Sequence, residues 1–377
     1  MQSFDVAIIG AGIVGLAHAL AAARLGKRVI VLDRDAQANG ASIRNFGFIT
    51  VTGQERGLIW KRARRSRDVW LEIAAEAGIT IEHRGLMLAA QRPEAMNVIE
   101  AFAQTEMGEG CTLMTATTAR ARYPLRPDGK LAGAMWSPHD IRVESRFAIP
   151  ALAAWLAAKY DVAFMRTAAV LGVHDKIVRT DDMAIQADAV IVCPGDDFTT
   201  LYPDRIAARG PTRCRLQMLR MASPGVRLPG ALMSDLSLVR YLGYAALPQS
   251  AALGALLHHE QPLYLENGIH LIVVQSADGS VVVGDSHHYA TTPDPFAFEA
   301  VDSLILAEYE ALLGPAPTVI QRWTGTYASG PQQSFVDTPE PGVRIVMVTS
   351  GTGASTSFAI AEEVIGDLFG VKMGLAA

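Results

Sequence analysis

The sequence predicts an α/β protein built around a parallel sheet, and three observations lead to this fold class. Residues 4–9 form an apolar run that leads through a glycine-rich turn and an alanine-rich segment into a second apolar run, residues 28–32. Two later runs, residues 189–193 and 344–348, also end in turns that contain glycine. Apolar runs without alternation are typical of strands buried on both faces, as in parallel sheets covered by helices.

The first turn has the spacing of a dinucleotide-binding motif. The expected strand 4–9 is followed by Gly10, Ala11, Gly12, Ile13, Val14 and Gly15. In this motif the first glycine permits a tight turn, the second lets the backbone approach a pyrophosphate, and the third lets the next helix pack closely. The helix-forming segment 16–25 stops at Gly26, and the next strand ends in Asp33, an acid suited to a ribose hydroxyl. Together these elements predict a Rossmann-like domain with a bound dinucleotide.

Composition limits the class of protein. The chain has 377 residues, 50% hydrophobic and 19% charged, which is enough for two packed domains. Its formal net charge of −5 argues against a nucleic-acid partner, which would need a basic surface. We expect the basic run 61–67 to form a solvated helix face.

The cysteines and the apolar runs indicate the cellular compartment in which we expect the protein. Cys111, Cys193 and Cys214 lie far apart and form neither a disulfide framework nor a metal-binding pair. No apolar run approaches the roughly 18 residues of a membrane span, and we recognise no secretory leader. We therefore expect a cytoplasmic protein without a metal site. The oligomeric state stays open.

A second cofactor segment follows Asp33. Arg34 and Asp35 lead into a small polar loop, residues 39–48, with the sequence Asn-Gly-Ala-Ser-Ile-Arg-Asn-Phe-Gly-Phe. This loop resembles the segment of the D-amino-acid oxidase, glycine oxidase and sarcosine oxidase family in which a Gly-Ala-Ser stretch meets the flavin phosphates and ring edge. The resemblance implies that the dinucleotide is FAD. It also implies cofactor contacts from Arg34, Ala41, Ser42, Arg44, Asn45 and Gly47.

The run 189–193 strengthens this resemblance. It ends in Pro194 and Gly195, like the family's strand that brings backbone close to the adenosine half of FAD. The resemblance implies cofactor contacts here from Val170, Cys193, Pro194 and Gly195.

The C-terminal region shows a third similarity. The strand 344–348 leads through residues 349–357 into a helix that we expect over residues 358–369. In this family such a loop and helix lie over the flavin pyrimidine, where the helix N-terminus stabilises the negative charge of reduced flavin. The implied contacts are Gly353, Ala354, Ser355 and Thr356.

The resemblance also implies a discontinuous architecture, with a largely antiparallel α+β substrate domain inserted into the Rossmann-like FAD-binding domain. We place the FAD-binding domain at residues 1–83, 142–212 and 320–377, and the substrate domain at residues 84–141 and 213–319. The sequence pattern is compatible with this division. We expect helices at 93–107 and 149–159 and strands at 84–90, 131–136, 162–164 and 168–173. Strands should dominate from 216 to 283, including a strand-like run at 237–244 and a hairpin whose Asp-Gly turn is at 278–279.

Candidate substrate contacts come from several segments. His287 and His288 follow an expected strand, where a histidine can bind an anion or manage an amine proton, although a structural role is equally compatible. Neighbours in a strand point to opposite faces, so the sequence does not decide which histidine faces the flavin. The other candidates are Arg44, Asn45, Arg240, Tyr241 and Tyr327. Arg44 could instead support phosphate or backbone, and we expect structural roles for Arg142 and Arg146.

Two departures from better-known family members concern the segment Trp323-Thr324-Gly325-Thr326-Tyr327. Amino-acid oxidases commonly place a carboxylate-binding arginine shortly after such a Trp-x-Gly, and this chain does not. The cysteine that attaches flavin in monomeric sarcosine oxidases is also missing, which implies non-covalent FAD. Residues 41–47, 137–144, 284–289 and 323–329 resemble a clade of these oxidases associated with phosphonate breakdown.

These observations predict an FAD-dependent amine oxidase that uses molecular oxygen and releases an imine and hydrogen peroxide. The expected substrate is a small anionic amine, an aminophosphonate or an N-methylated aminophosphonate. Two alternatives remain: an amino-acid or amine dehydrogenase with an acceptor other than oxygen, and a flavin-binding redox-sensing subunit.

Overall fold

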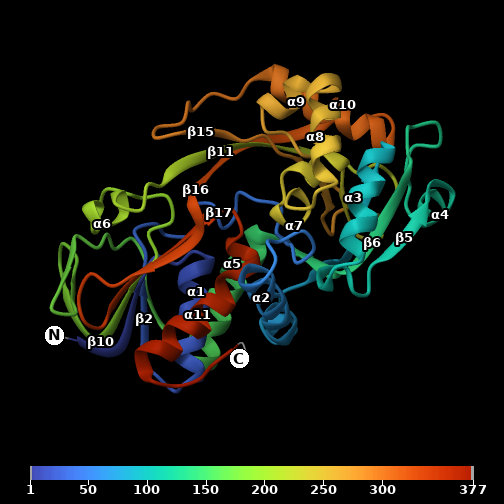
Figure 1. Cartoon of the computed structure of the whole chain (residues 1–377). Coiled ribbons are helices and arrows are strands. Elements are labelled where there is room, and N and C mark those ends of the chain that lie inside the picture. The colour runs from blue at the N-terminus through green and yellow to red at the C-terminus, as the bar shows by residue number, and fades with distance from the viewer. Residues whose placement is uncertain (1, 375–377) are drawn as a thin grey trace.

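A five-stranded parallel sheet forms one half of the protein in this computed structural model, which describes residues 2–374 (Figure 1). Strand β1 (Gln2–Ile9) lies between β2 (Val29–Leu32) and β10 (Ala184–Val192). Strand β7 (Ala163–Met165) extends the sheet beside β2, and β17 (Val343–Ser350) extends it beside β10. The register pairs Ile9 with both Leu32 and Val192, so the carboxyl ends of the central strands meet at one edge. The predicted α/β fold with a parallel sheet is therefore confirmed.

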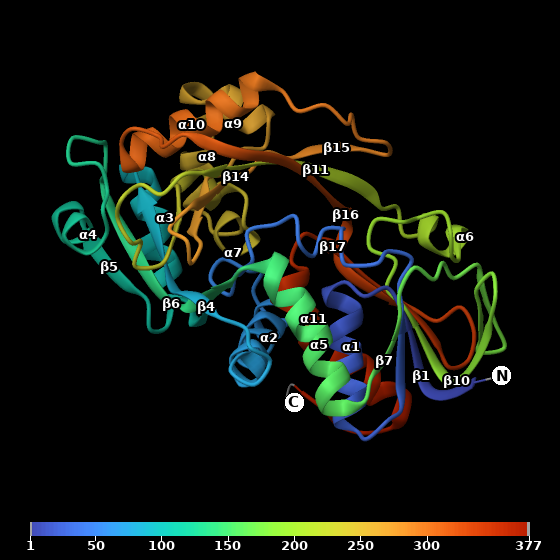
Figure 2. The ribbon, with the colours of Figure 1, turned by 180° about the vertical axis from the view of Figure 1, so that it is seen from behind.

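Helices cover one face of this sheet, and Figure 2 shows three of them, α1, α5 and α11, side by side. These three are α1 (Ile13–Arg24), α5 (Ser145–Tyr160) and α11 (Gly353–Phe369), and α2 (Leu58–Ala74) packs on α11. Helices α2 and α11 are joined where the indole of Trp70 meets the ring of Phe358 edge-on at 5.1 Å and donates a hydrogen bond to the Ala354 carbonyl. The small hairpin of β8 (Gly172–His174) and β9 (Ile177–Arg179) adds to the sheet beside β10.

The other half of the protein is a larger, mostly antiparallel sheet. Its strand order is β16–β11–β14–β13–β12–β4–β6–β5, and only the β4–β12 pairing is parallel. The strands are β4 (Ile81–Ala90), β5 (Thr112–Thr115), β6 (Gly133–Val143), β11 (Thr212–Met221), β12 (Ala231–Met233), β13 (Ile272–Gln275), β14 (Val281–Gly284) and β16 (Val319–Asp337). Short strands β3 (Phe48–Ile49) and β15 (His288–Ala290) pair with β6 and β11.

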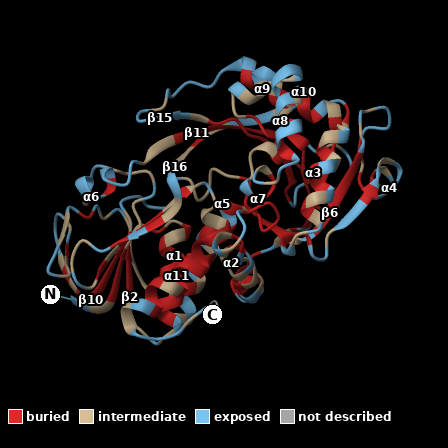
Figure 3. Cartoon of the chain, in the orientation of Figure 1, coloured by how far each residue is buried: buried red, intermediate tan, exposed pale blue. Residues whose placement is uncertain are grey.

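Several helices pack on or beside this second sheet, and both sheets are largely buried (Figure 3). They are α3 (Pro93–Ala103), α4 (Ala116–Arg122), α7 (Leu242–Ala245), α8 (Ser250–Glu260), α9 (Pro262–Glu266), α10 (Glu299–Leu313) and the 3₁₀ turns η1 (Glu106–Gly108) and η2 (Asp235–Val239). Helix α6 (Pro203–Ala207) lies between β10 and β11 in the chain.

Strand β16 connects the two sheets. Its first part, up to Ser329, pairs with β11, and its later part, from Ser329 to Asp337, pairs with β17. The carboxyl edge of the parallel sheet therefore lies against the second sheet. The division of the chain at residues 83, 141, 212 and 319 stays a prediction that this pairing pattern supports.

Several local predictions were wrong. The segment 237–244 is not a strand, because residues 235–245 form the tight turns η2 and α7. Strands do not dominate throughout 216–283, since the alanine- and leucine-rich segment 250–260 follows its helix propensity and forms α8. Of the expected strand 168–173, only residues 172 and 173 lie in a strand, β8, which continues to His174. The helix expected at 93–107 ends at Ala103.

The basic run on α2 also differs from the expectation of a solvated face. Arg62 binds Glu363 and Arg65 binds Glu362, both on α11, and these arginines are partly buried. None of the helices within residues 2–374 combines the length and the apolar character that crossing a membrane requires.

Candidate active site

A cavity of about 740 Å³ lies between the carboxyl edge of the parallel sheet and the second sheet. Its first wall comes from residues that follow β1, β2 and β10, and from the start of α11. Its opposite wall, which we call the polar wall, is formed by Arg240, Tyr241, His270, Asp285, His287, Tyr289 and Tyr327. The cavity therefore joins the predicted cofactor motif to side chains that carry charge and hydrogen-bonding groups.

The turn after β1 has the backbone geometry of a phosphate cradle. A Cβ atom on Gly10, whose φ is +103°, would lie 2.4 Å from the Cys193 carbonyl oxygen, and one on Gly15 would lie 1.8 Å from the Gly10 carbonyl oxygen. Gly10, Gly12, Ile13 and Val14 line the cavity, whereas Ala11 and Gly15 pack behind it. Only glycine permits this approach of the α1 N-terminus to β1.

Asp33 holds the same turn at the end of β2. Its Oδ2 accepts a hydrogen bond from the Ala11 amide at 2.6 Å, and its Oδ1 accepts one from the Asp35 amide at 2.9 Å. Each carboxylate oxygen has a further lone pair, so Asp33, which lines the cavity, can still accept a ribose hydroxyl. Arg34 also lines the cavity, and its guanidinium binds Asp197 at 2.8 Å.

The loop after β2 supports the α1 N-terminus. Ser42 Oγ accepts the Ile13 amide at 2.9 Å, and Ala41, Ser42, Arg44 and Asn45 line the cavity. The Asn45 side chain is used within the loop, because it donates to the Ala41 carbonyl and accepts from the Gly47 amide. Asn45 is thus suited to shaping the loop. Gly47 lies off the cavity and packs against Val143, whose carbonyl oxygen would be 1.8 Å from an added Cβ.

The remaining predicted cofactor contacts mostly line the cavity too. They are Val170, Cys193, Pro194, Gly195, Gly353, Ala354 and Ser355. Thr356 does not, because α11 begins at Gly353 and not at the expected residue 358. One turn into the helix, the buried Thr356 hydroxyl donates to the Thr352 carbonyl at 3.0 Å.

The N-terminus of α11 faces the cavity without a side-chain cap from residues 2–374. Its first amides therefore leave donors and a partial positive charge available to an anionic group. With the glycine turn and Asp33, this arrangement fits a dinucleotide, with a second anion-stabilising end where a reduced flavin would carry charge.

On the polar wall, Arg240 Nη2 donates a hydrogen bond to the Tyr289 hydroxyl at 2.8 Å. Burial opposes the charge of Arg240, but the surrounding tyrosines and Asp285 together raise its pKa, so it is a permanent cation. Tyr241 and Tyr327 lie beside it, and burial raises the pKa of both hydroxyls, which therefore stay protonated. Although Arg240 and Tyr241 do not lie on a strand as expected, both face the cavity.

The side chains of His287 and His288 lie in different surroundings. His287 lines the cavity, with its ring stacked on His270 at a centroid distance of 5.0 Å. His288 belongs to β15 opposite Arg215, lies outside the cavity lining, and has its Nε2 3.1 Å from Asn267 Oδ1. The sequence left this choice open, and the predicted site role of His288 loses its basis because its ring is engaged elsewhere.

Sequence reasoning missed Asp285 and His270, which complete the polar wall. Asp285 lies 3.3 Å from His270 and 3.7 Å from His287, measured between carboxylate oxygens and Nε2 atoms. A single acid directly after the apolar run 281–284 was the available signal for Asp285. His270 precedes β13 in an apolar segment and gave no such signal.

Comparisons with known proteins also indicate a protein that binds a flavin dinucleotide. The family model described as FAD dependent oxidoreductase, DAO, matches residues 5–366. Glycine oxidase from Bacillus cereus ATCC 14579 is similar in structure, with a TM-score of 0.78 and 18% identity over 99% of each chain. Iminodiacetate oxidase from Chelativorans sp. BNC1 has a TM-score of 0.73 and 20% identity, covering 98% of this chain and 97% of that one.

A third similar structure is the reduced, FAD-bound L-α-glycerophosphate oxidase from Mycoplasma pneumoniae, with a TM-score of 0.75 and 14% identity over 100% and 97% of the two chains. The search of curated proteins gives no match. At these identities the structures establish the fold, and the family match establishes the cofactor as FAD.

Proposed function

Because this chain belongs to the DAO family of FAD-dependent oxidoreductases, we propose that it is an amine oxidase for a small anionic amine. The proposed substrate is an aminophosphonate or an N-methylated aminophosphonate, oxidised at the carbon next to nitrogen. The products are an imine, which hydrolyses to an aldehyde, and hydrogen peroxide. The observation that carries the proposal is the permanent cation Arg240 on the polar wall of the cavity that contains the cofactor motif.

The cofactor and the protein have separate tasks. When bound, FAD accepts a hydride from the carbon next to a neutral amine. Gly10, Gly12 and Asp33 would hold its pyrophosphate and ribose, and the α11 N-terminus would stabilise the charge that develops on reduction. The polar wall orients the substrate through its charged and hydrogen-bonding groups, of which His270, Asp285 and His287 are buried.

Arg240 supports an anionic substrate. A guanidinium can give two parallel hydrogen bonds to a carboxylate or phosphonate, and partial burial strengthens such charge-assisted bonds. Arg44, which also lines the cavity, has one Nη bonded to Asn39 at 3.1 Å and offers further donors. Two arginines suit a phosphonate, which has three oxygens and more negative charge than a carboxylate.

The choice of a phosphonate over a carboxylate rests on two further observations. Residues 137–144, 284–289 and 323–329 resemble the phosphonate-associated clade, and residues 285, 287, 289 and 325–329 line the cavity. The position after Trp323-Thr324-Gly325, where amino-acid oxidases commonly have an arginine, is Thr326 followed by Tyr327.

The test is anaerobic reduction of the purified FAD protein, followed by its visible absorbance. The compounds are glycine, sarcosine, D-alanine, 2-aminoethylphosphonate and N-methyl-2-aminoethylphosphonate. We expect the two aminophosphonates to bleach the oxidised flavin band and the amino acids to do so slowly or not at all. Robust reduction by an amino acid alone would overturn the proposed substrate.

Admission of air then identifies the acceptor. Stoichiometric hydrogen peroxide is the expected result for an oxidase. Reduced flavin that persists in air and reoxidises with a quinone would instead identify a dehydrogenase. Flavin that no compound reduces would favour the redox-sensing subunit.

A further inference from the structure

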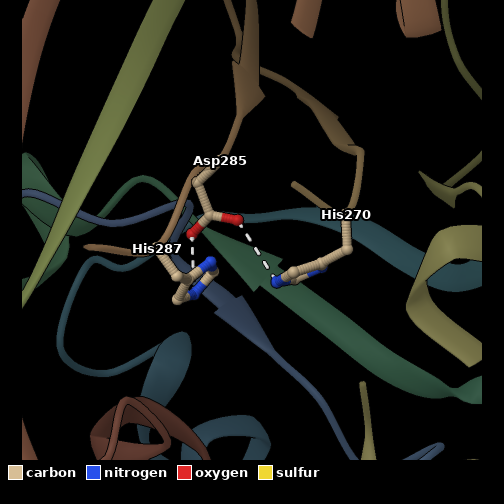
Figure 4. A group of neighbouring side chains, drawn as sticks. All are labelled: His270, Asp285 and His287. Atoms are coloured by element: carbon tan, nitrogen blue, oxygen red, sulfur yellow. Dashed lines mark ion pairs between the residues drawn. The ribbon is translucent and has the colours of Figure 1, made fainter. Parts of the chain in front are cut away.

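His270, Asp285 and His287 converge on the polar wall, and Figure 4 shows the Asp285 carboxylate between the two imidazoles. Asp285 Oδ1 lies 3.3 Å from His270 Nε2, and Oδ2 lies 3.7 Å from His287 Nε2. All three side chains are buried, with Asp285 only 4% exposed, and all three line the cavity. A carboxyl group removed from water is costly unless it serves as a structural partner or meets a ligand.

The hydrogen bonds of His287 define which of its nitrogens can accept a proton. Its Nδ1 lies 2.9 Å from the Gly268 carbonyl oxygen, which can only accept, so Nδ1 carries the hydrogen. Burial, with a contribution from Arg240, holds the pKa of His287 well below its usual value, so the ring is neutral. The lone pair of Nε2 therefore faces the Asp285 carboxylate, and two proton acceptors meet at one spot of the cavity.

One oxygen of the Asp285 carboxylate, Oδ1, is buried without a hydrogen-bond donor within the described chain. Although His270 Nε2 is near Oδ1, the geometry is not that of a hydrogen bond, and Oδ1 has no other partner among residues 2–374. The other groups that face Asp285 electrostatically are Arg240, Tyr241 and Cys214. Burial outweighs the opposing effect of Arg240 and raises the pKa of Asp285 to about 7.

We propose that Asp285 binds the ammonium group of the substrate and accepts its proton, with His287 Nε2 as the second acceptor. This inference rests on the proposed function, because it requires an amine substrate. In the step, an N–H bond of the ammonium breaks and an O–H bond forms on the Asp285 carboxylate. The electron pair of the broken bond stays on nitrogen as the lone pair of a neutral amine. No oxidant is consumed in this step.

Arg240 and Asp285 then bind the two oppositely charged ends of the zwitterionic substrate. The guanidinium binds the anionic end, and the carboxylate with His287 binds the nitrogen, so the substrate enters in one orientation. A substrate without the amine leaves the acceptors unpaired, and one without the anion leaves Arg240 with its hydrogen bond to the Tyr289 hydroxyl but without a substrate anion. Buried groups without partners are a strong source of discrimination.

The first experiment needs no substrate. Infrared difference spectra of the FAD holoenzyme, recorded during a pH titration, report the C=O band of protonated carboxyl groups. We expect a component that titrates near pH 7 and disappears in Asp285→Asn. The matched control is Glu308→Gln, because burial also raises the pKa of Glu308 to about 7 but this residue lies outside the cavity lining. If Asp285→Asn leaves every neutral-range component in place, the proposal is overturned.

The second experiment follows the proton. Dithionite-reduced holoenzyme cannot oxidise a bound amine, so N-methyl-2-aminoethylphosphonate is added to it above pH 8 under anaerobic conditions. We expect the protonated-carboxyl band of Asp285 to appear on binding in the wild type and in Glu308→Gln, and to be missing from Asp285→Asn. Binding without this band in the wild type would show that Asp285 does not take the proton.

The third experiment measures the rate of flavin reduction against pH in the stopped flow. General base catalysis typically contributes on the order of 100-fold or more, so Asp285→Asn should reduce the rate about 100-fold at pH 7. The loss should shrink at high pH, where the free amine is already neutral. Asp285→Glu should keep the acidic limb of the profile, whereas a pH-independent loss in Asp285→Asn would indicate a merely structural role.

Two controls separate the possible failures. If none of the amines reduces the wild-type flavin, the proposed function fails, while the substrate-free titration still tests whether Asp285 exchanges a proton. Metal analysis of the holoenzyme tests whether a metal ion, and not the substrate amine, binds to His270, Asp285 and His287, since one ligand atom from each lies within 4.8 Å of the others. We expect no stoichiometric metal; zinc or iron that is bound by the wild type and lost in Asp285→Asn would overturn the proposal.

Discussion

The two walls of the cavity are built in different ways. The first wall, which we call the cofactor wall, contains the glycine-rich turn after β1, and its central part, from Gly10 to Ser42, comes from one continuous segment. The polar wall consists of side chains, and Arg240, Asp285 and Tyr327 reach it from three separate parts of the chain. Backbone geometry at glycines is set by local sequence, whereas the convergence of side chains depends on long-range strand pairing. The cofactor wall should therefore respond sharply to added atoms, and the polar wall to changes of charge.

The largest expected effect comes from Gly15→Val, which tests the close packing of the cofactor wall. The added Cβ would lie 1.8 Å from the Gly10 carbonyl oxygen and 3.0 Å from its carbon, so backbone must move. We expect no bound FAD after purification and a loss of several kcal/mol of stability. Flavin absorbance and urea unfolding measure the two effects.

Gly12→Ala is the matched control for this prediction. Its Cβ would meet the Ser42 hydroxyl at 2.8 Å, the end of a side chain that can rotate. The fold should survive and FAD should bind more weakly. An equal loss of stability in both variants would contradict the idea that backbone contact is the limiting feature.

The next effect concerns a buried carboxyl outside the cavity, Glu308 on α10, which accepts hydrogen bonds from Gln91 and Gln261. Burial raises its pKa from 4.5 to about 7 in the folded protein. A carboxyl with a raised folded pKa prefers the protonated form, so its favourable contribution is complete below about pH 4.5 and is lost as the pH rises through about 7.

Glu308→Gln removes this titration. Above pH 7 the variant should be more stable than the wild type by at most about 3 kcal/mol, and the difference should vanish toward pH 4.5. Urea unfolding at saturating FAD measures it. Because Asp285 titrates in the same range in both proteins, the difference between them isolates Glu308. A stability difference that does not change with pH would contradict the assignment.

A somewhat smaller effect is expected from Arg240→Met on the polar wall. Methionine keeps the length of the side chain but removes the charge that the substrate's anionic end would use. We expect kcat/KM for N-methyl-2-aminoethylphosphonate to fall about 10- to 100-fold, mainly through KM, since a charged hydrogen bond contributes about 1.5–3 kcal/mol. Bound FAD should be unchanged.

Arg126→Met is the control for the loss of one positive charge, because Arg126 pairs with Asp128 away from the cavity. If Arg240→Met retains the wild-type KM, the anionic part of the substrate is bound elsewhere, and Arg44 becomes the residue to substitute.

The contrast between the walls also explains what the sequence could predict. The segment from Phe4 to Asp33 carries its own strand, turn, helix and acid, so the parallel sheet and the dinucleotide motif followed from local pattern. The identity of the dinucleotide as FAD came from the resemblance of later segments to a known family. The sequence did not reveal the partners of His287, because Asp285 and His270 meet only after β13 pairs with β14. Register also decides that His287 and not His288 faces the cavity.

The smallest expected effect comes from breaking an ion pair between α2 and α11, away from the cavity lining. Arg62 binds Glu363 with two hydrogen bonds of 2.9 and 2.5 Å, and both side chains are partly exposed. Arg62→Met should lower the free energy of unfolding by no more than about 1 kcal/mol, and added salt should reduce this loss because exposed pairs are screened.

Lys61→Met is the appropriate comparison, since Lys61 lies on the same helix, is exposed, and has no ion-pair partner among residues 2–374. A double-mutant cycle of Arg62→Met with Glu363→Gln isolates the pair from the lost aliphatic packing of the arginine. A coupling energy well above about 1 kcal/mol would mean that this pair contributes strongly to holding α2 against α11, whose first residues line the cavity. FAD affinity should then fall together with stability, and the cofactor wall would depend on side-chain charge as the polar wall does.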